Sequence, residues 1–367
     1  MTKIPIIILG PGNVGRALLR QLLDTRDVLA GRAGLRLTLT ALADSRALLF
    51  DPAGLPDDAL AVALQAKRDG RSLDALPGAR PLGDLSAALQ PGAILVDVTA
   101  STKTGPTLRA TLGAGCGVVL ANKHPLSGPW PEAWTLLEHP RLRYEATVGA
   151  GLPAIATLRT LLGTGDQATA IEGCLSGTLG YLCAQLERGA SYSAAVAQAK
   201  ALGYTEPDPR EDLGGRDVAR KALILARTAG WPLEMDDVSV EALYPESLSA
   251  VSTPDFMAAL PTLDEPYARR VREAHVGGRV LRYVARVGPG GGQVGLEAVD
   301  QDSMLGALRG PANYVAFHTR RYDQVPLVIS GPGAGPEVTA AGVLGDIIAL
   351  ALHRASSITN HVEEGKR

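Results

Sequence analysis

"IPIIILGPGNVGRALLRQLL", residues 4–23, indicates the fold class of this 367-residue chain. Its first part, Ile4–Leu9, is an apolar run rich in β-branched residues, as in buried parallel strands. A glycine turn follows, and then Val14, Leu18 and Leu22 recur at helical spacing. The order of strand, glycine turn and helix predicts the first unit of a Rossmann-type sheet.

The glycines of this turn match the pattern G-x-G-x-x-G. Gly10 permits a tight turn, Gly12 lets the backbone approach a pyrophosphate, and Gly15 lets helix and strand pack closely. The free amides at the start of the helix favour an anion. We therefore expect a dinucleotide cofactor here, held by Gly10, Gly12, Asn13, Val14 and Gly15. A plain strand-to-helix turn is the alternative.

The second predicted strand, Leu35–Asp44, ends in Asp44, Ser45 and Arg46, which we expect near the adenosine ribose. A carboxylate there accepts hydrogen bonds from a 2′-hydroxyl and favours NAD, whereas an arginine accommodates a 2′-phosphate and favours NADP. Both residue types are present, so the cofactor preference stays open. Alternatively, Asp44 caps a turn and Arg46 faces solvent.

Three later segments also read as strands of the same sheet: "GAILVDVTAS" at 92–101, "GCGVVLANK" at 115–123 and "RLRYEATVGAG" at 141–151. Strands that alternate with helices through short connections predict a doubly wound parallel sheet. We assign residues 1–150 to this dinucleotide-binding domain.

After residue 150 the pattern changes. Helical runs at 152–162, 179–187, 192–202 and from 215 are followed by strand-like segments at 279–288, 292–300 and 313–322. They predict a second, α+β domain over residues 151–328, with a mixed or antiparallel sheet. Residues 329–367 contain a glycine loop and a long apolar helix, which we expect to pack back on the first domain. Gly333 of that loop either approaches the cofactor or belongs to a flexible connection.

The composition of the chain indicates which classes of binding partner to expect. The net charge of −2 gives no general attraction to nucleic acid or to an anionic membrane, so the expected ligands are small molecules. The N-terminal apolar run is too short for a signal peptide or a membrane span. Three cysteines without metal-ligand spacing argue against a disulfide framework or a zinc site and fit a cytoplasmic protein.

The most heavily charged stretch is "YTEPDPREDLGGRDVARKALILAR", residues 204–227. Asp217 and Lys221 are four apart and share a helix face, which by itself favours an exposed ion pair contributing ~0.3–0.5 kcal/mol. Lys123 stands at the end of a predicted strand, on the edge where open α/β sheets bind ligands. Local charge patterning alone leaves a solvated surface as the simpler interpretation.

Longer motifs carry a resemblance to a known family. They are "GPGNVG", "ADSRALL", "VDVTAS", "ANKHPLSG", "YEATVGAGLPAI", "SGTLGYL", "GYTEPDPREDLGGRDVARKALILAR" and "GPGAGPEVTAAGVLGDI". In this order they resemble homoserine dehydrogenase over almost the whole chain, in its short form without a C-terminal regulatory domain. That family interconverts L-aspartate 4-semialdehyde and L-homoserine with NAD or NADP.

The resemblance implies roles for individual residues. It implies Lys221 and Lys123 as catalytic lysines, with Asp217 positioning Lys221 and Lys123 also facing the cofactor. It implies a substrate pocket made by Tyr204, Glu206, Asp212, Thr178 and Gly177, and a nicotinamide side lined by Thr99 and Ala100. It further implies a Na⁺ or K⁺ ion held by backbone oxygens of Val148, Ala150 and Leu152 near Glu145; the alternative for "GAGLP" is a tight backbone turn without an ion. A homodimer formed through the middle domain is also implied.

Two alternative functions stay open. Aspartate-semialdehyde dehydrogenase acts on the same metabolite but needs a nucleophilic cysteine. Cys116, Cys174 and Cys183 lie in apolar contexts typical of buried structural cysteines. A catalytically silent NAD(P)H sensor would keep the glycine turn without needing the set Lys221, Asp217 and Glu206.

Overall fold

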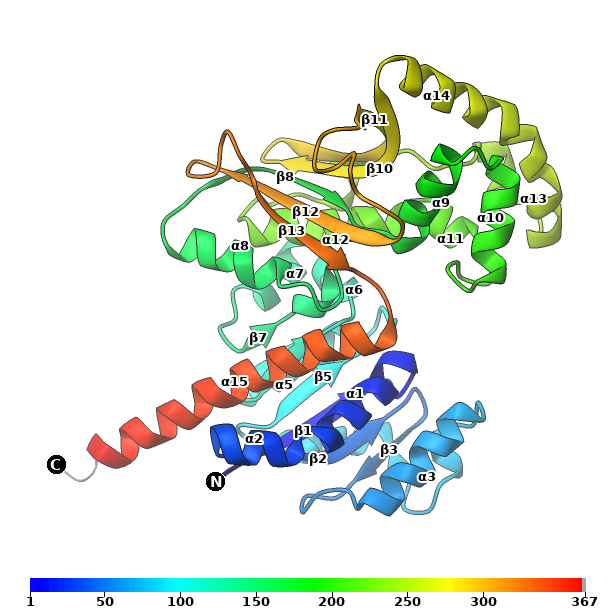
Figure 1. Ribbon diagram of the computed structural model, residues 1–367. Coiled ribbons are helices and arrows are strands. Elements are labelled where there is room, and N and C mark those ends of the chain that lie inside the picture. The colour runs from blue at the N-terminus through cyan, green and yellow to red at the C-terminus, as the bar shows by residue number, and fades with distance from the viewer. Residues whose placement is uncertain (365–367) are drawn as a thin grey trace. The chain divides into compact units, whose positions relative to one another are not determined.

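The computed structural model describes residues 1–364, with side chains described as far as Ala355. The chain forms two compact units, unit 1 from Met1–Gly151 together with the segment from Gly335 onward, and unit 2 from Leu152–Ala334 (Figure 1). The chain therefore leaves unit 1, builds unit 2 and returns. Residues 365–367, which end the expected C-terminal segment, lie outside the described part.

Unit 1 is built on a seven-stranded sheet. Its strands, in the order β4-β3-β2-β1-β5-β6-β7, are β4 (Arg80–Pro81), β3 (Ala47–Phe50), β2 (Leu35–Ala43), β1 (Thr2–Leu9), β5 (Ile94–Asp97), β6 (Gly117–Leu120) and β7 (Leu142–Arg143). Five neighbouring strands run parallel: β2, β1, β5, β6 and β7. The strand β3 pairs antiparallel with β2 and with β4. The chain order reverses on either side of β1, so the carboxyl end of β1 is the switch point where such sheets bind ligands.

Eight α-helices belong to the described part of unit 1: α1 (Asn13–Asp24), α2 (Arg26–Ala33), α3 (Asp57–Arg68), α4 (Leu85–Ala88), α5 (Gly105–Gly113), α6 (His124–Ser127), α7 (Trp130–Leu137) and α15 (Pro336–Glu364). The long helix α15 runs beside α1 and packs on β5 and β6 (Figure 1). At its start, Glu337 accepts hydrogen bonds from Arg20 and Gln21 of α1.

Helix α15 is long and apolar enough over Pro336–Ala355 to cross a membrane, judged by length and composition alone. One stripe of it is fully buried, however, with Ala340, Val343 and Ile347 packed in the same core as Ile4 and its neighbours on β1. Burial of such a stripe at i, i+3 and i+7 is what a core helix requires. Its apolar character is therefore explained by the core of unit 1.

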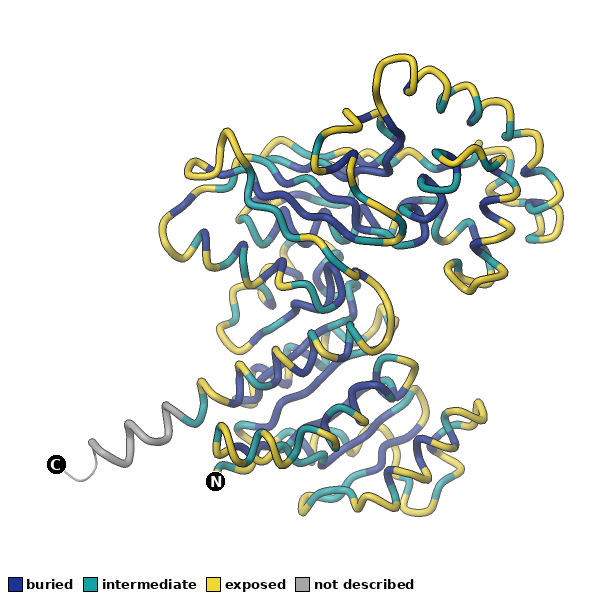
Figure 2. The backbone as a smooth tube through the Cα atoms, viewed as in Figure 1, coloured by how far each residue is buried: buried dark blue, intermediate teal, exposed yellow. Residues whose placement is uncertain are grey.

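Unit 2 contains a six-stranded mixed sheet. Its strands, in the order β13-β12-β8-β10-β11-β9, are β13 (Leu327–Pro332), β12 (Ala312–Thr319), β8 (Ala168–Cys174), β10 (Arg279–Gly288), β11 (Gly291–Asp300) and β9 (Val238–Val240). Only the edge pair of β9 and β11 is parallel. Dark blue, buried stretches mark the inner strands of both sheets (Figure 2).

The α-helices of unit 2 are α8 (Ala154–Gly163), α9 (Gly177–Glu187), α10 (Tyr192–Ala201), α11 (Arg210–Leu213), α12 (Arg216–Thr228), α13 (Thr253–Ala259) and α14 (Asp264–Val276). Helices α9, α12 and α14 pack on β10. The strand β10 and the helix α12 therefore share a core, and α12 carries the charged motif that the sequence singled out.

Some local expectations were wrong. The segment 141–151 was expected to be a strand, but β7 covers only Leu142–Arg143, and a 3₁₀ turn, Glu145–Thr147, follows. Gly149 and Ala150 then adopt positive φ angles of 77° and 57°, which extended strands do not contain. The strands β3 and β8 were not predicted. The expected domain limit at residue 328 falls inside β13, which pairs with β12 and belongs to unit 2.

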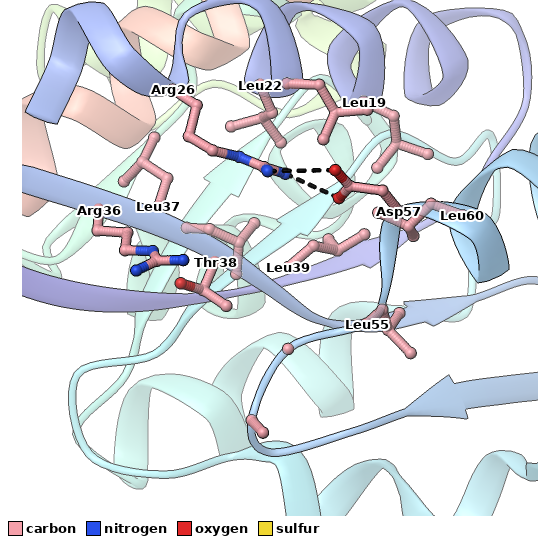
Figure 3. A pocket seen from close by; sticks show the side chains of 14 residues that line it. Leu19, Leu22, Arg26, Arg36, Leu37, Thr38, Leu39, Leu55, Asp57 and Leu60 are labelled. Carbon is pink, nitrogen blue, oxygen red and sulfur yellow. Dashed lines mark hydrogen bonds and ion pairs between the residues drawn. The ribbon is translucent and has the colours of Figure 1, made fainter.

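A small cavity of about 160 Å³ lies inside unit 1 between β2, α1 and the start of α3 (Figure 3). Half of its lining residues are leucines. Arg26 binds both oxygens of Asp57 across one side, at 3.0 and 3.3 Å. That ion pair is the main cause that lowers the pKa of the Asp57 carboxyl. The cavity lies along the middle of β2, away from the switch point.

Two glycines of the first turn make contrasting predictions. A Cβ on Gly15 would overlap the carbonyl oxygen of Gly10, whereas a Cβ on Gly12 would meet no atom within 4 Å. We therefore expect Gly15→Ala to lower the free energy of unfolding by roughly 1–3 kcal/mol through overpacking. Gly12→Ala should leave it within about 0.5 kcal/mol of the unaltered protein. Urea unfolding of both variants tests this, and equal losses would contradict it.

Candidate functional site

The turn between β1 and α1 has the features of an anion site. Gly10 has a φ of 95°, and its amide donates to the Ala43 carbonyl at 2.8 Å, which joins the turn to β2. Gly12 is the N-cap of α1, and no side chain caps this helix start. Gly12 and Asn13 are exposed. Uncapped amides and open space around Gly12 are what a pyrophosphate group requires.

The end of β5 lies beside this turn. A Cβ on Gly10 would come within 2.8 Å of Thr99 Cγ2, so the two strand ends meet closely. Thr99 is held by Asp97, whose Oδ1 accepts from the Thr99 amide at 3.0 Å and the Thr99 hydroxyl at 2.7 Å. The Asp97 residue is completely buried. The position of the predicted nicotinamide side therefore depends on an acid that the sequence reasoning did not select, although "VDVTAS" contains it.

Asn122 completes the same network at the end of β6. Its side-chain amide donates to Asp97 Oδ2 at 3.0 Å and to the Ser101 carbonyl at 2.8 Å, and its oxygen accepts from the His124 amide at 3.1 Å. Asn122 thereby ties the loop after β5 to the start of α6. Lys123 is the N-cap of α6 and follows Asn122 directly, so its backbone position is set by this network.

Asp44, which follows β2, accepts hydrogen bonds from several segments of unit 1. Its Oδ1 accepts from the amides of Arg46 and Ala47, and its Oδ2 from Lys67 Nζ, Ser72 Oγ and the Leu73 amide, all within 3.1 Å. Burial would raise the pKa of this carboxyl, but those hydrogen bonds together lower the pKa well below its usual range. Its side chain is only 7% exposed, whereas that of Arg46 is 70% exposed.

In unit 2, Lys221 and Asp217 lie one turn apart on α12. Lys221 Nζ lies 2.9 Å from Asp217 Oδ2 and donates to the Leu175 carbonyl at 2.6 Å. The lysine side chain is 14% exposed, so this is not the solvated pair that charge patterning alone suggested. Gly215, the N-cap of α12, has a φ of 69°, and a Cβ there would overlap the Tyr283 hydroxyl. The close packing of Gly215 therefore helps to set where α12 and its lysine lie.

The loop that carries Tyr204 and Glu206 is braced by two polar side chains. The Thr178 hydroxyl has a single proton and lies within hydrogen-bond distance of two acceptors, the Tyr204 carbonyl at 2.6 Å and Asp212 Oδ1 at 3.2 Å. Asp212 Oδ2 accepts from the Glu206 amide at 2.8 Å. Burial raises the pKa of the Asp212 carboxyl, the charges of Glu206 and Asp217 act in the same direction, and the hydrogen bonds oppose it. Asp212 and Thr178 therefore shape the loop, and the exposed Glu206 side chain remains accessible to a ligand.

Family models match both parts of the chain. The model described as "Homoserine dehydrogenase, NAD binding domain" matches residues 10–137, and the model described as "Homoserine dehydrogenase" matches residues 153–348. The chain belongs to the homoserine dehydrogenase family. The α/β fold with a parallel Rossmann-type sheet and a second sheet domain, expected from the sequence, is confirmed.

Curated relatives of the family agree. The chain is 42% identical over 358 residues to bifunctional aspartokinase/homoserine dehydrogenase 1 of Zea mays, covering 95% of this chain but 38% of that protein. It thus spans about two fifths of the length of that relative. It is also 42% identical over 280 residues to the homoserine dehydrogenase of Emericella nidulans, covering 71% of this chain and 76% of that one.

A solved structure of the family supports the fold. A hyperthermophilic archaeal homoserine dehydrogenase in complex with NADPH is similar with a TM-score of 0.72 and 25% identity. The similarity covers 96% of this chain and 98% of that one. The whole course of the chain through both units therefore follows the family fold.

The segment expected to hold the family's monovalent ion is an irregular turn. Glu145 is buried, and its amide donates to Asp346 Oδ2 of α15 at 2.8 Å. Ala150 has a φ of 57°, rare for a residue with a side chain. Val148 and Ala150 belong to unit 1 and Leu152 to unit 2. Among the described residues no group of three or more His, Cys, Asp or Glu side chains could hold a metal ion.

Two glycines expected at the site, Gly333 and Gly177, also have structural roles. Gly333 lies against Asn313, and a Cβ there would overlap the Asn313 side chain, so this glycine is needed for packing within unit 2. Gly177 is the first residue of α9, whose N-cap Ser176 accepts from the Leu179 amide at 3.2 Å. This cap fixes the start of the helix that carries Thr178.

Arg210, which sequence reasoning left without a chemical role, holds the acidic loop in place. It binds Asp208 through Nε and Nη2 and donates to the backbone carbonyls of Ser249 and Val251 at 2.9 and 2.6 Å. Asp208 also accepts from Thr253 at 3.1 Å. The hydrogen bond from Arg210 is the largest cause that lowers the pKa of Asp208 to about 2.

This pair predicts a pH-dependent stability. Because the folded-state pKa of Asp208 lies below the ordinary value of ~3.9, its contribution is present above that value and is lost as pH falls toward about 2. We expect Asp208→Asn to cost roughly 1–2 kcal/mol of unfolding free energy at neutral pH. The difference from the unaltered protein should shrink steadily below about pH 5.

Urea unfolding at a series of pH values measures both quantities. Glu211→Gln, at an exposed neighbouring position, is the matched control and should change the unfolding free energy by less than about 0.5 kcal/mol at every pH. A cost of Asp208→Asn that does not change between neutral and acidic pH would contradict the assignment.

Proposed function

We propose that this protein interconverts L-aspartate 4-semialdehyde and L-homoserine, with hydride transfer to or from NADP or NAD. The observation that carries the proposal is the anchored pair of Lys221 and Asp217 in unit 2 of a homoserine dehydrogenase family member. The Leu175 carbonyl that fixes Lys221 comes just before α9, so the lysine and the loop braced by Thr178 are built on neighbouring backbone.

Lys221 supplies charge and a proton donor at the reacting oxygen. An ammonium group has three N–H bonds. Two of them are accounted for by the Leu175 carbonyl and Asp217, which leaves the third for the substrate oxygen. As the aldehyde is reduced its oxygen gains negative charge, and a fixed ammonium stabilises that charge without reorganising. Asp217 orients Lys221, and Glu206 is the acid we assign to the substrate ammonium, with Tyr204 and Asp212 beside it.

Unit 1 would hold the cofactor. The glycine turn, the uncapped start of α1 and the open space at Gly12 fit a pyrophosphate, and Thr99 and Ala100 lie at the neighbouring strand end. When bound, the nicotinamide donates or accepts the hydride. Asp97 and Asn122 keep Thr99 and the backbone of Lys123 in place, and Lys123 is the second lysine assigned to the reaction.

Three further parts of the proposal rest on family membership. The protein would be a cytoplasmic homodimer that pairs through the strands β10 and β11 of unit 2. A Na⁺ or K⁺ ion would bind backbone oxygens of Val148, Ala150 and Leu152, near Glu145. The positive φ angles of Gly149 and Ala150 support this because they turn successive carbonyls away from an extended course.

The alternative of aspartate-semialdehyde dehydrogenase is disfavoured by its need for a thiolate nucleophile. All three cysteines are buried. Burial raises the pKa of the thiols of Cys116 and Cys174, and it raises the pKa of Cys183 to about 11. A silent NAD(P)H sensor is disfavoured by the ordered set of Lys221, Asp217, Thr178 and Asp212, which cofactor binding alone does not require.

Lys221→Ala tests the reaction. Homoserine oxidation, followed by the absorbance of the reduced nicotinamide, should lose about 10²-fold or more in kcat, because the fixed charge at the reacting oxygen is removed. Cofactor affinity, measured by titration calorimetry, should stay nearly unchanged. Arg216→Gln, an exposed change on the same helix, is the control and should keep kcat. Near-normal turnover by Lys221→Ala would contradict the assignment, and no oxidation by the unaltered protein would sink the proposed function.

Arg46→Gln tests the cofactor preference. Because both oxygens of Asp44 already accept hydrogen bonds from five donors, Asp44 has little capacity left for a ribose 2′-hydroxyl. The exposed Arg46 beside it can pair with a 2′-phosphate. We expect the unaltered protein to prefer NADP, and Arg46→Gln to lower kcat/KM for NADP roughly tenfold with little change for NAD. Equal losses with both cofactors would contradict this.

A further inference from the structure

A larger cavity, of about 470 Å³, opens at the amino-terminal edge of the unit 1 sheet, where β5 and β6 begin. The glycine turn that fits a cofactor lies at the opposite, carboxyl edge of the sheet. The cavity is therefore separate from the site assigned to the dehydrogenase reaction. Its volume is within the range of roughly 300–1,000 Å³ that small-molecule sites occupy.

Two arginines line this cavity, Arg354 from α15 and Arg141 from the turn before β7. Arg354 Nη2 donates to the Pro91 carbonyl at 3.2 Å, and Arg141 Nη1 donates to the Gly115 carbonyl at 3.3 Å. Burial raises the pKa of the Cys116 thiol, and the charges of both arginines oppose that rise. Both guanidinium groups therefore act on one small region.

The Arg354 guanidinium has an unused donor. Its Nη1 is buried and finds no hydrogen-bond partner among the residues that the structure describes. The hydrogen bonds that the described residues give Arg354 and Arg141 are with backbone carbonyls, not with acids. A charged donor that is buried without an acceptor destabilises the folded protein, because its lost hydration is not replaced. In native proteins such donors are normally satisfied by protein groups, water, ions or ligands.

Gly92 makes this arrangement possible. It has a φ of 85°, and a Cβ on it would overlap the Arg354 guanidinium. The Arg354 guanidinium therefore packs directly on Gly92, in the loop before β5. His353 of α15 also lines the cavity, and Ile94 of β5 with Leu350 and Ala351 of α15 forms an apolar part of its wall. A ligand that fits this cavity would carry a negative charge for the arginines and a hydrocarbon part for the apolar side chains.

We propose that this cavity binds a small aliphatic carboxylate. The carboxylate pairs with Arg354 and Arg141, and the hydrocarbon chain lies against Ile94 and Leu350. Guanidinium groups bind carboxylates through parallel, charge-assisted hydrogen bonds. The site is distinct from the dehydrogenase site and does not depend on the proposed reaction.

Titration calorimetry of the full chain with isovalerate tests the proposal. Isoamyl alcohol, which has the same branched chain without the charge, is the ligand control and should not bind measurably. Arg354→Gln and Arg141→Gln should each weaken isovalerate binding roughly tenfold or more, because each removes one charge-assisted contact. Arg68→Gln, an exposed change on α3 of the same unit, should leave the affinity unchanged.

Several outcomes would overturn the proposal. They are no binding of isovalerate by the unaltered protein, equal binding of isoamyl alcohol, or unchanged affinity in both arginine variants. Inorganic phosphate that competes with isovalerate and binds as tightly would show that the apolar wall contributes nothing, which also overturns an aliphatic ligand. The comparison of the two probes on the unaltered protein does not depend on the folding of any variant.

Discussion

The backbone of Gly15 packs directly against the carbonyl oxygen of Gly10, at a distance that excludes a side chain on Gly15. This contact lets α1 start immediately after β1 and lie close along the sheet. The first amides of α1 then face the switch point next to Thr99, and α15 finds a surface on α1 to pack against. The close packing of α1 on β1 therefore depends on the absence of a side chain at Gly15.

Buried polar groups hold both parts of the candidate site. Asp97 and Asn122 tie together the loops after β5 and β6, and Thr178 and Asp212 brace the loop that carries Glu206. Each of these side chains satisfies backbone or hydroxyl groups, which is the condition for burying a polar group cheaply. The residues assigned to ligands are instead those with donors or acceptors left over. The side chains that position the site are therefore different from the side chains assigned to bind ligands.

Much of the fold could be predicted from the sequence because its signals are local. The helices α10 and α12 and the strands β1, β10 and β11 agree with periodicity and glycine turns to within a few residues. The strand β8, "ATAIEGC", has weak alternation, and it exists because β10 and β12 pair with it on both sides. The segment after β7 looks extended in sequence, but positive φ angles at Gly149 and Ala150 turn it.

By itself, the sequence determined the strand, turn and helix order, the glycine loop, and the spacing that puts Asp217 and Lys221 on one helix face. It could not decide whether Asp44 binds a cofactor or braces a turn, because three of its donors come from residues 67–73. Nor could it bring Arg141 and Arg354 to one cavity, since the two are joined only by the return of α15 to unit 1. Hydrogen-bond satisfaction and charge clustering between distant segments are properties of the tertiary structure, because no local pattern encodes which groups will meet.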